Sequence, residues 1–289
     1  MKFLIFGGNG FLGTYLYRFL KKNHTVYRVT RKKGTGIYLK NFNHNEISCI
    51  INKFNPQIII NTIATTSVDN CELYQKKAYY SNVSITEMIV NSIKYNYNSK
   101  KKPFFVHIST DQVYSGKGPH KETKTRPINY YSKTKLLSEN FVKNINGCVL
   151  RTNFIGNSTV PYNFNKWIYE HIKKNKKIFG YKNILFSPLA MDTLAKKIVI
   201  ISRKKINGIY NLGSVGGVSK GQYISKFLNK NFPQFNKFEL INYKKPTNKK
   251  KATRSLDMRM NCSKLINNHK FKLPNTSTEV NRIINNFKK

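Results

Sequence analysis

Residues 2–13, KFLIFGGNGFLG, decide the fold. Lys2 to Phe6 is a short run typical of a buried strand, and it leads directly into a glycine-rich loop that contains Gly7, Gly10 and Gly13. After the glycines, Tyr15, Leu16, Phe19 and Leu20 are spaced like the apolar face of a helix. A strand, a glycine loop and a helix in this order are the context that a dinucleotide-binding loop requires.

The three glycines suit different parts of such a loop. Gly7 permits a tight turn, Gly10 lets the backbone approach a pyrophosphate at the positive end of the helix, and Gly13 allows close helix packing. The spacing is Gly-x-x-Gly-x-x-Gly, whereas Gly-x-Gly-x-x-Gly is commoner. The predicted cofactor contacts of this loop are Gly7, Asn9, Gly10, Phe11, Leu12 and Gly13.

The second predicted strand, Thr25 to Thr30, indicates which cofactor is used. An NAD site usually places an Asp or Glu at the end of this strand, to bind the ribose 2′-hydroxyl. Here the strand is followed by Arg31 and Lys32, whose charges suit a 2′-phosphate. We therefore predict NADPH as the cofactor, with NADH left open.

Strands and helices alternate through residue 155, which predicts an α/β protein with a Rossmann-type, doubly wound parallel sheet. We expect residues 1–155 to form a dinucleotide-binding domain. Residues 156–289 are predicted to mix a small C-terminal substrate-binding lobe with elements that return to the sheet. Ala64 and Thr65, and the later Ser109-Thr110-Asp111, follow strands and are expected at the same sheet edge, where ligands bind.

Tyr131 and Lys135 lie four residues apart, so on a helix they share one face. Taken alone, this spacing also fits a solvated helix face. A positive charge beside a phenol favours the phenolate, so we expect Lys135 to lower the pKa of Tyr131. On the same predicted helix, the side chains expected to be buried are Leu136, Leu137, Phe141 and Val142.

Composition limits the other classes of protein. The chain has 289 residues and a net charge of +40, but its cations are scattered and no nucleic-acid motif accompanies them. We attribute the charge to a composition bias and expect no nucleic-acid partner. No apolar run approaches the roughly 20 residues of a membrane helix, so a cytoplasmic protein without a membrane partner is expected. The Cys and His spacings predict buried free thiols and no metal site.

Several segments together resemble one known family. In chain order they are Gly7–Gly13, Pro56–Asn61, Ser67–Asp69, Ile108–Gly116, Tyr131–Leu136, Arg151–Phe154, Ser187–Pro188 and Arg254–Leu265. In order and spacing, the chain resembles the extended short-chain dehydrogenase/reductases, and within them the dTDP-4-dehydrorhamnose reductases. The resemblance implies NADPH-dependent reduction of a nucleotide-linked 4-keto-6-deoxy sugar, in the synthesis of deoxysugars for polysaccharide or glycoprotein. It leaves a homodimer open.

The resemblance also implies roles for individual residues. Tyr131 would protonate the carbonyl oxygen of the sugar, Lys135 would bind the nicotinamide ribose, and Thr110 would orient the carbonyl. Asn163, Lys166 and Arg254 are the expected contacts of the nucleotide diphosphate, because the matching family segments face the substrate and because cations suit phosphates. The substrate contacts expected in total are Asp111, Gln112, Phe154, Asn163, Lys166 and Arg254.

Two residues separate this chain from relatives. Sugar-nucleotide 4,6-dehydratases resemble it but carry Glu where Gln112 stands, and an amide cannot act as a carboxylate base, so a dehydratase ranks below a reductase. Phe154 stands where the reductases often have Trp. A sugar-nucleotide epimerase would use the same Tyr and Lys and stays an alternative, as does a non-catalytic NADP-binding regulatory subunit.

Overall fold

A parallel sheet of seven strands forms the centre of the molecule, in the order β11-β6-β5-β4-β1-β2-β3. The structure is a computed structural model that describes residues 1–96, 102–156, 163–248 and 251–287. The strands of this sheet are β1 (Lys2–Phe6), β2 (Thr25–Thr30), β3 (Ile37–Tyr38), β4 (Ile58–Asn61), β5 (Phe104–Thr110), β6 (Gly147–Thr152) and β11 (Gly208–Leu212). The predicted Rossmann-type α/β fold is confirmed, and the strand order reverses between β1 and β4, where such sheets bind ligands.

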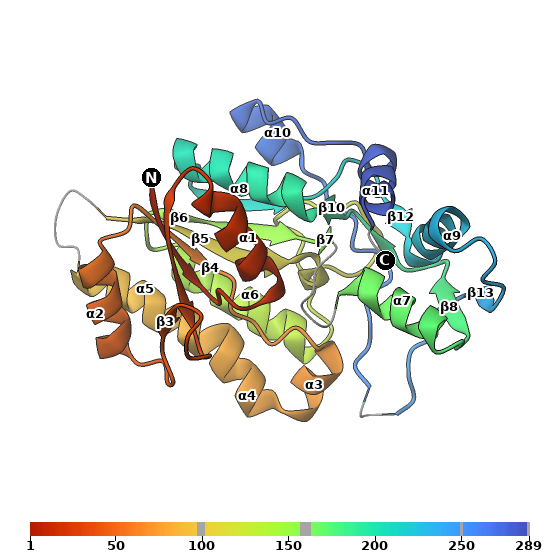
Figure 1. Ribbon diagram of the computed structural model, residues 1–289, viewed down its shortest axis with the longest axis horizontal. Coiled ribbons are helices and arrows are strands. Elements are labelled where there is room, and N and C mark those ends of the chain that lie inside the picture. The colour runs from red at the N-terminus through yellow and green to blue at the C-terminus, as the bar shows by residue number, and fades with distance from the viewer. Residues whose placement is uncertain (97–101, 157–162, 249–250, 288–289) are drawn as a thin grey trace.

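Helices cover both faces of this sheet (Figure 1). Alternate side chains of β1 point to opposite faces: Phe3 and Ile5 join one core, and Leu4 and Phe6 join the other. The first core is covered by α1 (Phe11–Lys21), α8 (Met191–Lys204) and α10 (Ser263–His269). The second is covered by α2 (His44–Phe54), α5 (Ile85–Asn96) and α6 (Tyr130–Val142).

A smaller lobe lies beside the carboxyl ends of the sheet strands, at the right of Figure 1, around its own core. Tyr223 and Phe227 are central to that core. The lobe and its junction contain β7 (Phe154–Ile155), α7 (Phe164–Lys173), β8 (Ile178–Tyr181), β9 (Leu185–Phe186), β10 (Leu189–Ala190), β12 (Val218–Ser219), α9 (Lys220–Asn231), β13 (Phe238–Ile241) and α11 (Thr276–Asn285). Because α8, β11 and α10 belong to the sheet layers, the second half of the chain contributes to both parts; the division at residue 155 stays a proposal.

The segment between β4 and β5 is divided into several helical pieces. It forms α3 (Val68–Leu73), α4 (Gln75–Tyr79), a π-helical turn (Tyr80–Ser84) and then α5. Ser67 caps α3 through the backbone N–H of Asn70. No helix in the described ranges is both long and apolar enough to cross a membrane.

Helix α6 buries polar side chains, contrary to the pattern expected from its apolar residues. Leu137 is 47% exposed, so the prediction that it is buried is wrong. Ser132, Lys135 and Glu139 are instead fully buried against the sheet. The helix can bury this face because its polar side chains form hydrogen bonds and an ion pair with neighbouring residues.

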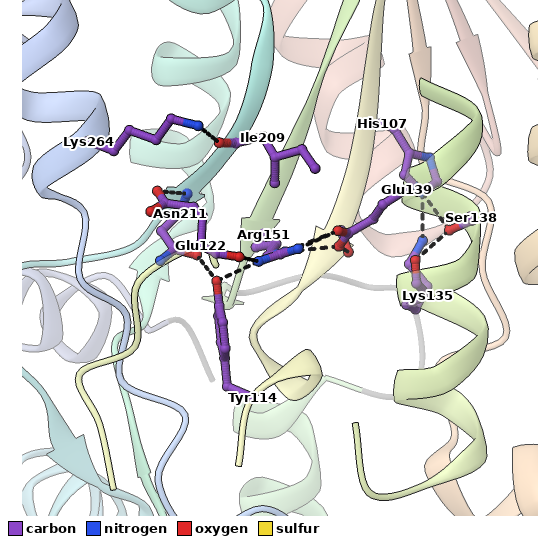
Figure 2. A network of polar contacts seen from close by, with 11 residues as sticks. His107, Tyr114, Glu122, Lys135, Ser138, Glu139, Arg151, Ile209, Asn211 and Lys264 are labelled. Carbon is purple, nitrogen blue, oxygen red and sulfur yellow. Dashed lines mark hydrogen bonds and ion pairs between the residues drawn. The ribbon is translucent and has the colours of Figure 1, made fainter. Parts of the chain in front are cut away.

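The strongest of these partners is Arg151 of β6, which forms a buried ion pair with Glu139 (Figure 2). Arg151 Nη2 lies 2.6 Å from Glu139 Oε2, and Ser109 Oγ donates to Glu139 Oε1 at 2.5 Å. On its other side, Arg151 Nη1 donates to Tyr114 Oη at 2.8 Å, and Tyr114 donates to Asn211 Oδ1 at 2.6 Å. One network therefore joins α6 to β5, β6 and β11.

We predict that Arg151→Met lowers the free energy of unfolding by about 3–5 kcal/mol, because it leaves the Glu139 carboxylate buried without its cation. Urea unfolding followed by circular dichroism measures the change. The control is Lys174→Met, which removes an exposed pair with Glu170 at 4.0 Å and should cost less than about 1 kcal/mol. Equal losses in the two variants would contradict this role of the network.

Candidate functional site

The glycine loop after β1 brings backbone atoms very close together. Gly7 has a φ of +84°, and its carbonyl accepts a hydrogen bond from the N–H of Gly10 at 2.9 Å. A Cβ on Gly13 would lie only 2.2 Å from Gly7 O. Gly10 caps α1 without a side-chain hydrogen bond, so the first-turn N–H groups face outward from the helix start, as anion binding requires.

A cavity of about 1180 Å³ opens in front of this loop. It brings together seven of the predicted cofactor contacts: Gly7, Asn9, Gly10, Arg31, Lys32, Ala64 and Thr65. Three further cations line it that the sequence analysis missed: Lys40, Lys76 and Lys77. A glycine cradle, a helix N-terminus and several cations fit a dinucleotide with phosphate groups.

The other predicted contacts of the loop lie outside this lining. Leu12 is buried in the core of the sheet, and Gly13 packs against Gly7. The ring of Phe11 stacks on Phe154, with 5.9 Å between centroids, so Phe154 touches the start of α1. The role of Phe11 and Leu12 toward a cofactor therefore stays a prediction.

Tyr131 lies at the carboxyl edge of the sheet and is only 7% exposed. Burial raises its pKa above the ordinary value, and a hydrogen bond with Thr110 lowers it in part. The expected lowering of this pKa by Lys135 is therefore wrong. The spacing in the sequence could show a shared helix face, but it could not show how completely the fold would bury the phenol.

The side chain of Lys135 is held by contacts with strand β5. Its Nζ donates to the carbonyl of Ile108 at 2.9 Å and lies 3.3 Å from His107 Nε2 (Figure 2). Burial lowers the pKa of Lys135 to about 8, and the charge of Glu139 opposes this. The pKa of His107 is well below its usual range because of burial and the nearby ammonium group, so His107 is neutral.

Asp111 follows Thr110 and is buried, with 1% exposure. Its Oδ2 accepts from Asn153 Nδ2 at 2.7 Å, and its Oδ1 accepts from Thr110 Oγ1 at 3.3 Å. Burial raises its pKa to about 6, against the effects of Asn153, Lys220 and Thr110. Gln112 is half-buried, and its backbone N–H donates to Thr110 Oγ1 at 3.2 Å.

A second cavity, of about 860 Å³, lies between α3 and the lobe. Four cations line it: Lys220, Lys244, Lys251 and Arg254. Its one carboxylate, Asp69, already pairs with Arg254 at 2.9 Å, so three lysines line the cavity without an acidic lining residue of their own. The predicted contact Arg254 is thus placed in a cationic cavity, beside lysines that the sequence analysis did not single out.

Two other predicted substrate contacts are placed differently. Asn163 caps α7 by accepting a hydrogen bond from the backbone N–H of Lys166 at 2.8 Å. Neither residue belongs to the lining of the cationic cavity in the described part of the chain. Their role toward a substrate stays a prediction.

The cysteine prediction is confirmed for three of the four residues. Cys71, Cys148 and Cys262 are buried free thiols, but Cys49 is exposed, contrary to the prediction that all are buried. Within residues 1–96, 102–156, 163–248 and 251–287, no group of three or more His, Cys, Asp or Glu side chains is arranged to hold a metal ion.

Comparison with known proteins identifies the family to which the chain is similar. Residues 1–289 match the family model described as RmlD substrate binding domain. The dTDP-4-dehydrorhamnose reductase of Aggregatibacter actinomycetemcomitans is 30% identical over 218 residues, covering 72% of this chain and 69% of that protein.

Two solved structures share the fold. A hypothetical dTDP-4-dehydrorhamnose reductase from Sulfolobus tokodaii superposes with a TM-score of 0.78 at 30% identity, covering 91% of this chain and 93% of that one. The dTDP-4-dehydrorhamnose reductase from Bacillus anthracis, solved in complex with NADP, gives a TM-score of 0.84 at 22% identity, covering 99% of this chain and 98% of that one.

The lowered pKa of Lys135 predicts how stability changes with pH. Folded Lys135 releases its proton near pH 8 and the unfolded residue near its ordinary pKa of 10.5, so the unfolded state binds more protons between these values. The free energy of unfolding should therefore rise with pH across this window, by about 3 kcal/mol at most. The measurement is the difference between the native chain and Lys135→Met in urea unfolding at pH 7 to 10.5. A constant difference would show that burial does not shift this lysine.

Proposed function

This chain belongs to the RmlD substrate binding domain family, and we propose that it is an NADPH-dependent reductase of a nucleotide-linked 4-keto-6-deoxy sugar in deoxysugar biosynthesis. The observation that carries the proposal is that Tyr131 packs beside chain segments that line the two cavities. Tyr131 packs with Val68 and Ala252, and Ala252 lines the cationic cavity. The chain just before Val68 lines the other cavity through Thr65.

NADPH fits the cavity of the glycine loop. Arg31, Lys32 and Lys40 supply positive charge there, which suits a 2′-phosphate better than a 2′-hydroxyl. The similar reductase solved with NADP agrees with this choice. Lys135 has three N–H groups and two protein contacts, which leaves one N–H for the nicotinamide ribose.

The cationic cavity suits the diphosphate of a nucleotide sugar. With the sugar carbonyl at Tyr131, the phenol would donate its proton to the carbonyl oxygen while Thr110 orients that oxygen. NADPH would supply the hydride to the carbonyl carbon. Burial helps here, because a raised pKa keeps Tyr131 protonated and ready to act as the acid.

Two other functions use the same residues. A sugar-nucleotide epimerase would oxidise and reduce its substrate with a cofactor that it keeps bound, and a regulatory subunit would bind NADP without turnover. A cytoplasmic location and a homodimer remain part of the proposal, because neither follows from the geometry of one chain.

The decisive experiment follows NADPH oxidation at 340 nm with a nucleotide-linked 4-keto-6-deoxy sugar, with and without a 3,5-epimerase. Oxidation that requires the epimerase supports a rhamnose-type reductase. Oxidation without the epimerase indicates another stereochemistry. Binding of NADPH in calorimetry without any oxidation would favour the regulatory subunit and contradict the proposal.

We expect Tyr131→Phe to lower kcat by about 10²–10⁴-fold, because the variant keeps the ring but loses the proton donor. The affinity for NADPH, measured by calorimetry, should stay within a few-fold of the native value. Tyr130→Phe, one residue earlier on α6, is the matched control and should keep its activity. Normal turnover by Tyr131→Phe would exclude Tyr131 as the acid.

A further inference from the structure

We propose that Asp111 supplies the proton that restores Tyr131 after each turnover, and that Lys220, in the cationic cavity, couples this supply to substrate binding. The inference rests on the proposed function, because it concerns the reduction at Tyr131. It gives Asp111 a part in the chemistry in place of the direct substrate contact that the sequence suggested.

The side chains of Tyr131, Thr110 and Asp111 are successive neighbours. The Thr110 hydroxyl lies beside the Tyr131 phenol and lowers its pKa in part, and Thr110 Oγ1 lies 3.3 Å from Asp111 Oδ1. All three are buried, with exposed fractions of 7%, 6% and 1%. Asn153 holds the other carboxylate oxygen at 2.7 Å, so Asp111 cannot turn away from Thr110 without losing that bond.

The protonation state of Asp111 determines which groups donate and which accept among Asp111, Thr110 and Tyr131, because the Thr110 hydroxyl has a single proton. When Asp111 is a carboxylate, Thr110 donates to it and can only accept from Tyr131, so the phenolic proton points away from the substrate. When Asp111 is protonated, it can donate to Thr110. The Thr110 proton is then free for the substrate oxygen or for Tyr131, and the phenolic proton is free for the carbonyl.

The proposed steps conserve protons. Tyr131 gives its proton to the carbonyl oxygen as hydride from NADPH reaches the carbonyl carbon, leaving an alcohol and a phenolate. The phenolate takes the Thr110 proton, and Thr110 takes the proton of the Asp111 carboxyl group. Asp111, now a carboxylate, regains a proton from water on the side of the cationic cavity.

Lys220 connects Asp111 to that cavity. It lies at the start of α9, lines the cavity, and its charge acts on both Asp111 and Arg254. The charged or titratable groups that face Asp111 are Lys220 from α9 and Tyr131 from α6, while its hydrogen-bond partners are neutral.

A diphosphate in the cavity would attract Lys220 and add negative charge, so it would favour the protonated form of Asp111. Burial already raises the pKa of Asp111 to about 6, so a modest further rise would protonate its carboxylate near neutral pH. Substrate binding would thus protonate Asp111, which would then supply the proton that the reduction consumes.

The chain offers a direct test, because Asp69, Asp111, Asp192 and Asp257 are its only aspartates. Aspartate labelled with ¹³C at the side-chain carboxyl gives four resonances, and Asp111→Asn assigns the one of interest. We expect Asp111 to titrate at the highest pH of the four. Lys220→Met should raise its midpoint by roughly 1 pH unit, because it removes a nearby opposite charge.

Inorganic pyrophosphate is the probe for the cavity. It should raise the Asp111 midpoint in the native chain and have less effect in Lys220→Met. The control is Lys226→Met, an exposed lysine on the same helix, which should behave like the native chain. An unchanged midpoint in Lys220→Met, or no response of the native chain to pyrophosphate, would overturn the coupling.

Kinetics test the relay itself. Asp111→Asn should lower kcat at least tenfold and remove the dependence of kcat on pH between 5 and 7, while NADPH affinity and melting temperature stay near the native values. A native pH profile in Asp111→Asn would overturn the relay. If the native chain showed no turnover at all, the proposed function would fail, and the carboxyl titration would still decide whether Lys220 and Asp111 are coupled.

Discussion

The buried ion pair between Arg151 and Glu139 is the constraint on which the site depends. Two charges removed from water are costly unless each is fully paired, so the pair fixes the position of every element that carries a partner. Glu139 lies one helical turn after Lys135, and Ser109, which also binds Glu139, directly precedes Thr110. The pair therefore sets the distance between the helix that carries Tyr131 and the strand that carries Thr110. Through Tyr114 and Asn211, the same network holds β11, which comes from the second half of the chain.

This network also bears on the burial of Tyr131 and Lys135. Apolar side chains could have covered the same face of α6, but they could not have oriented Ser109 or held the helix at one register. The polar contacts hold α6 against the sheet, where Lys135 is buried against β5, while Tyr131 is buried with Val68 and Ala252. Burial then shifts the pKa of the phenol upward and that of the ammonium group downward.

The sequence predicted the sheet, the glycine loop and the helix that carries Tyr131 and Lys135, because strand runs, glycine spacing and a four-residue interval are local patterns. Predictions from the sequence failed where contacts between distant segments determine which side chains are buried. Leu137 was assigned to the core because periodicity counts apolar residues, while α6 buries its polar face against partners such as Arg151. Lys220 carried no signal, because a chain with 52 Lys and Arg residues hides any single functional cation. The pair of Asp69 and Arg254 joins residues 185 positions apart, which no spacing rule could find.

The scarcity of acidic groups makes their surroundings informative. Among the buried carboxylates, Glu139 binds Arg151, and Asp257 binds Arg259, whose hydrogen bonds outweigh the effect of burial and lower the pKa of Asp257. Asp111 is buried as deeply as Glu139, yet its hydrogen-bond partners are the neutral Asn153 and Thr110, and the opposing charge that acts on it belongs to Lys220, which lines the cationic cavity. The carboxylates of Glu139 and Asp257 are each held by an arginine and hold neighbouring segments together. A carboxylate with neutral partners can change its charge when a ligand arrives, and Asp111 combines that freedom with a contact to the hydroxyl beside Tyr131.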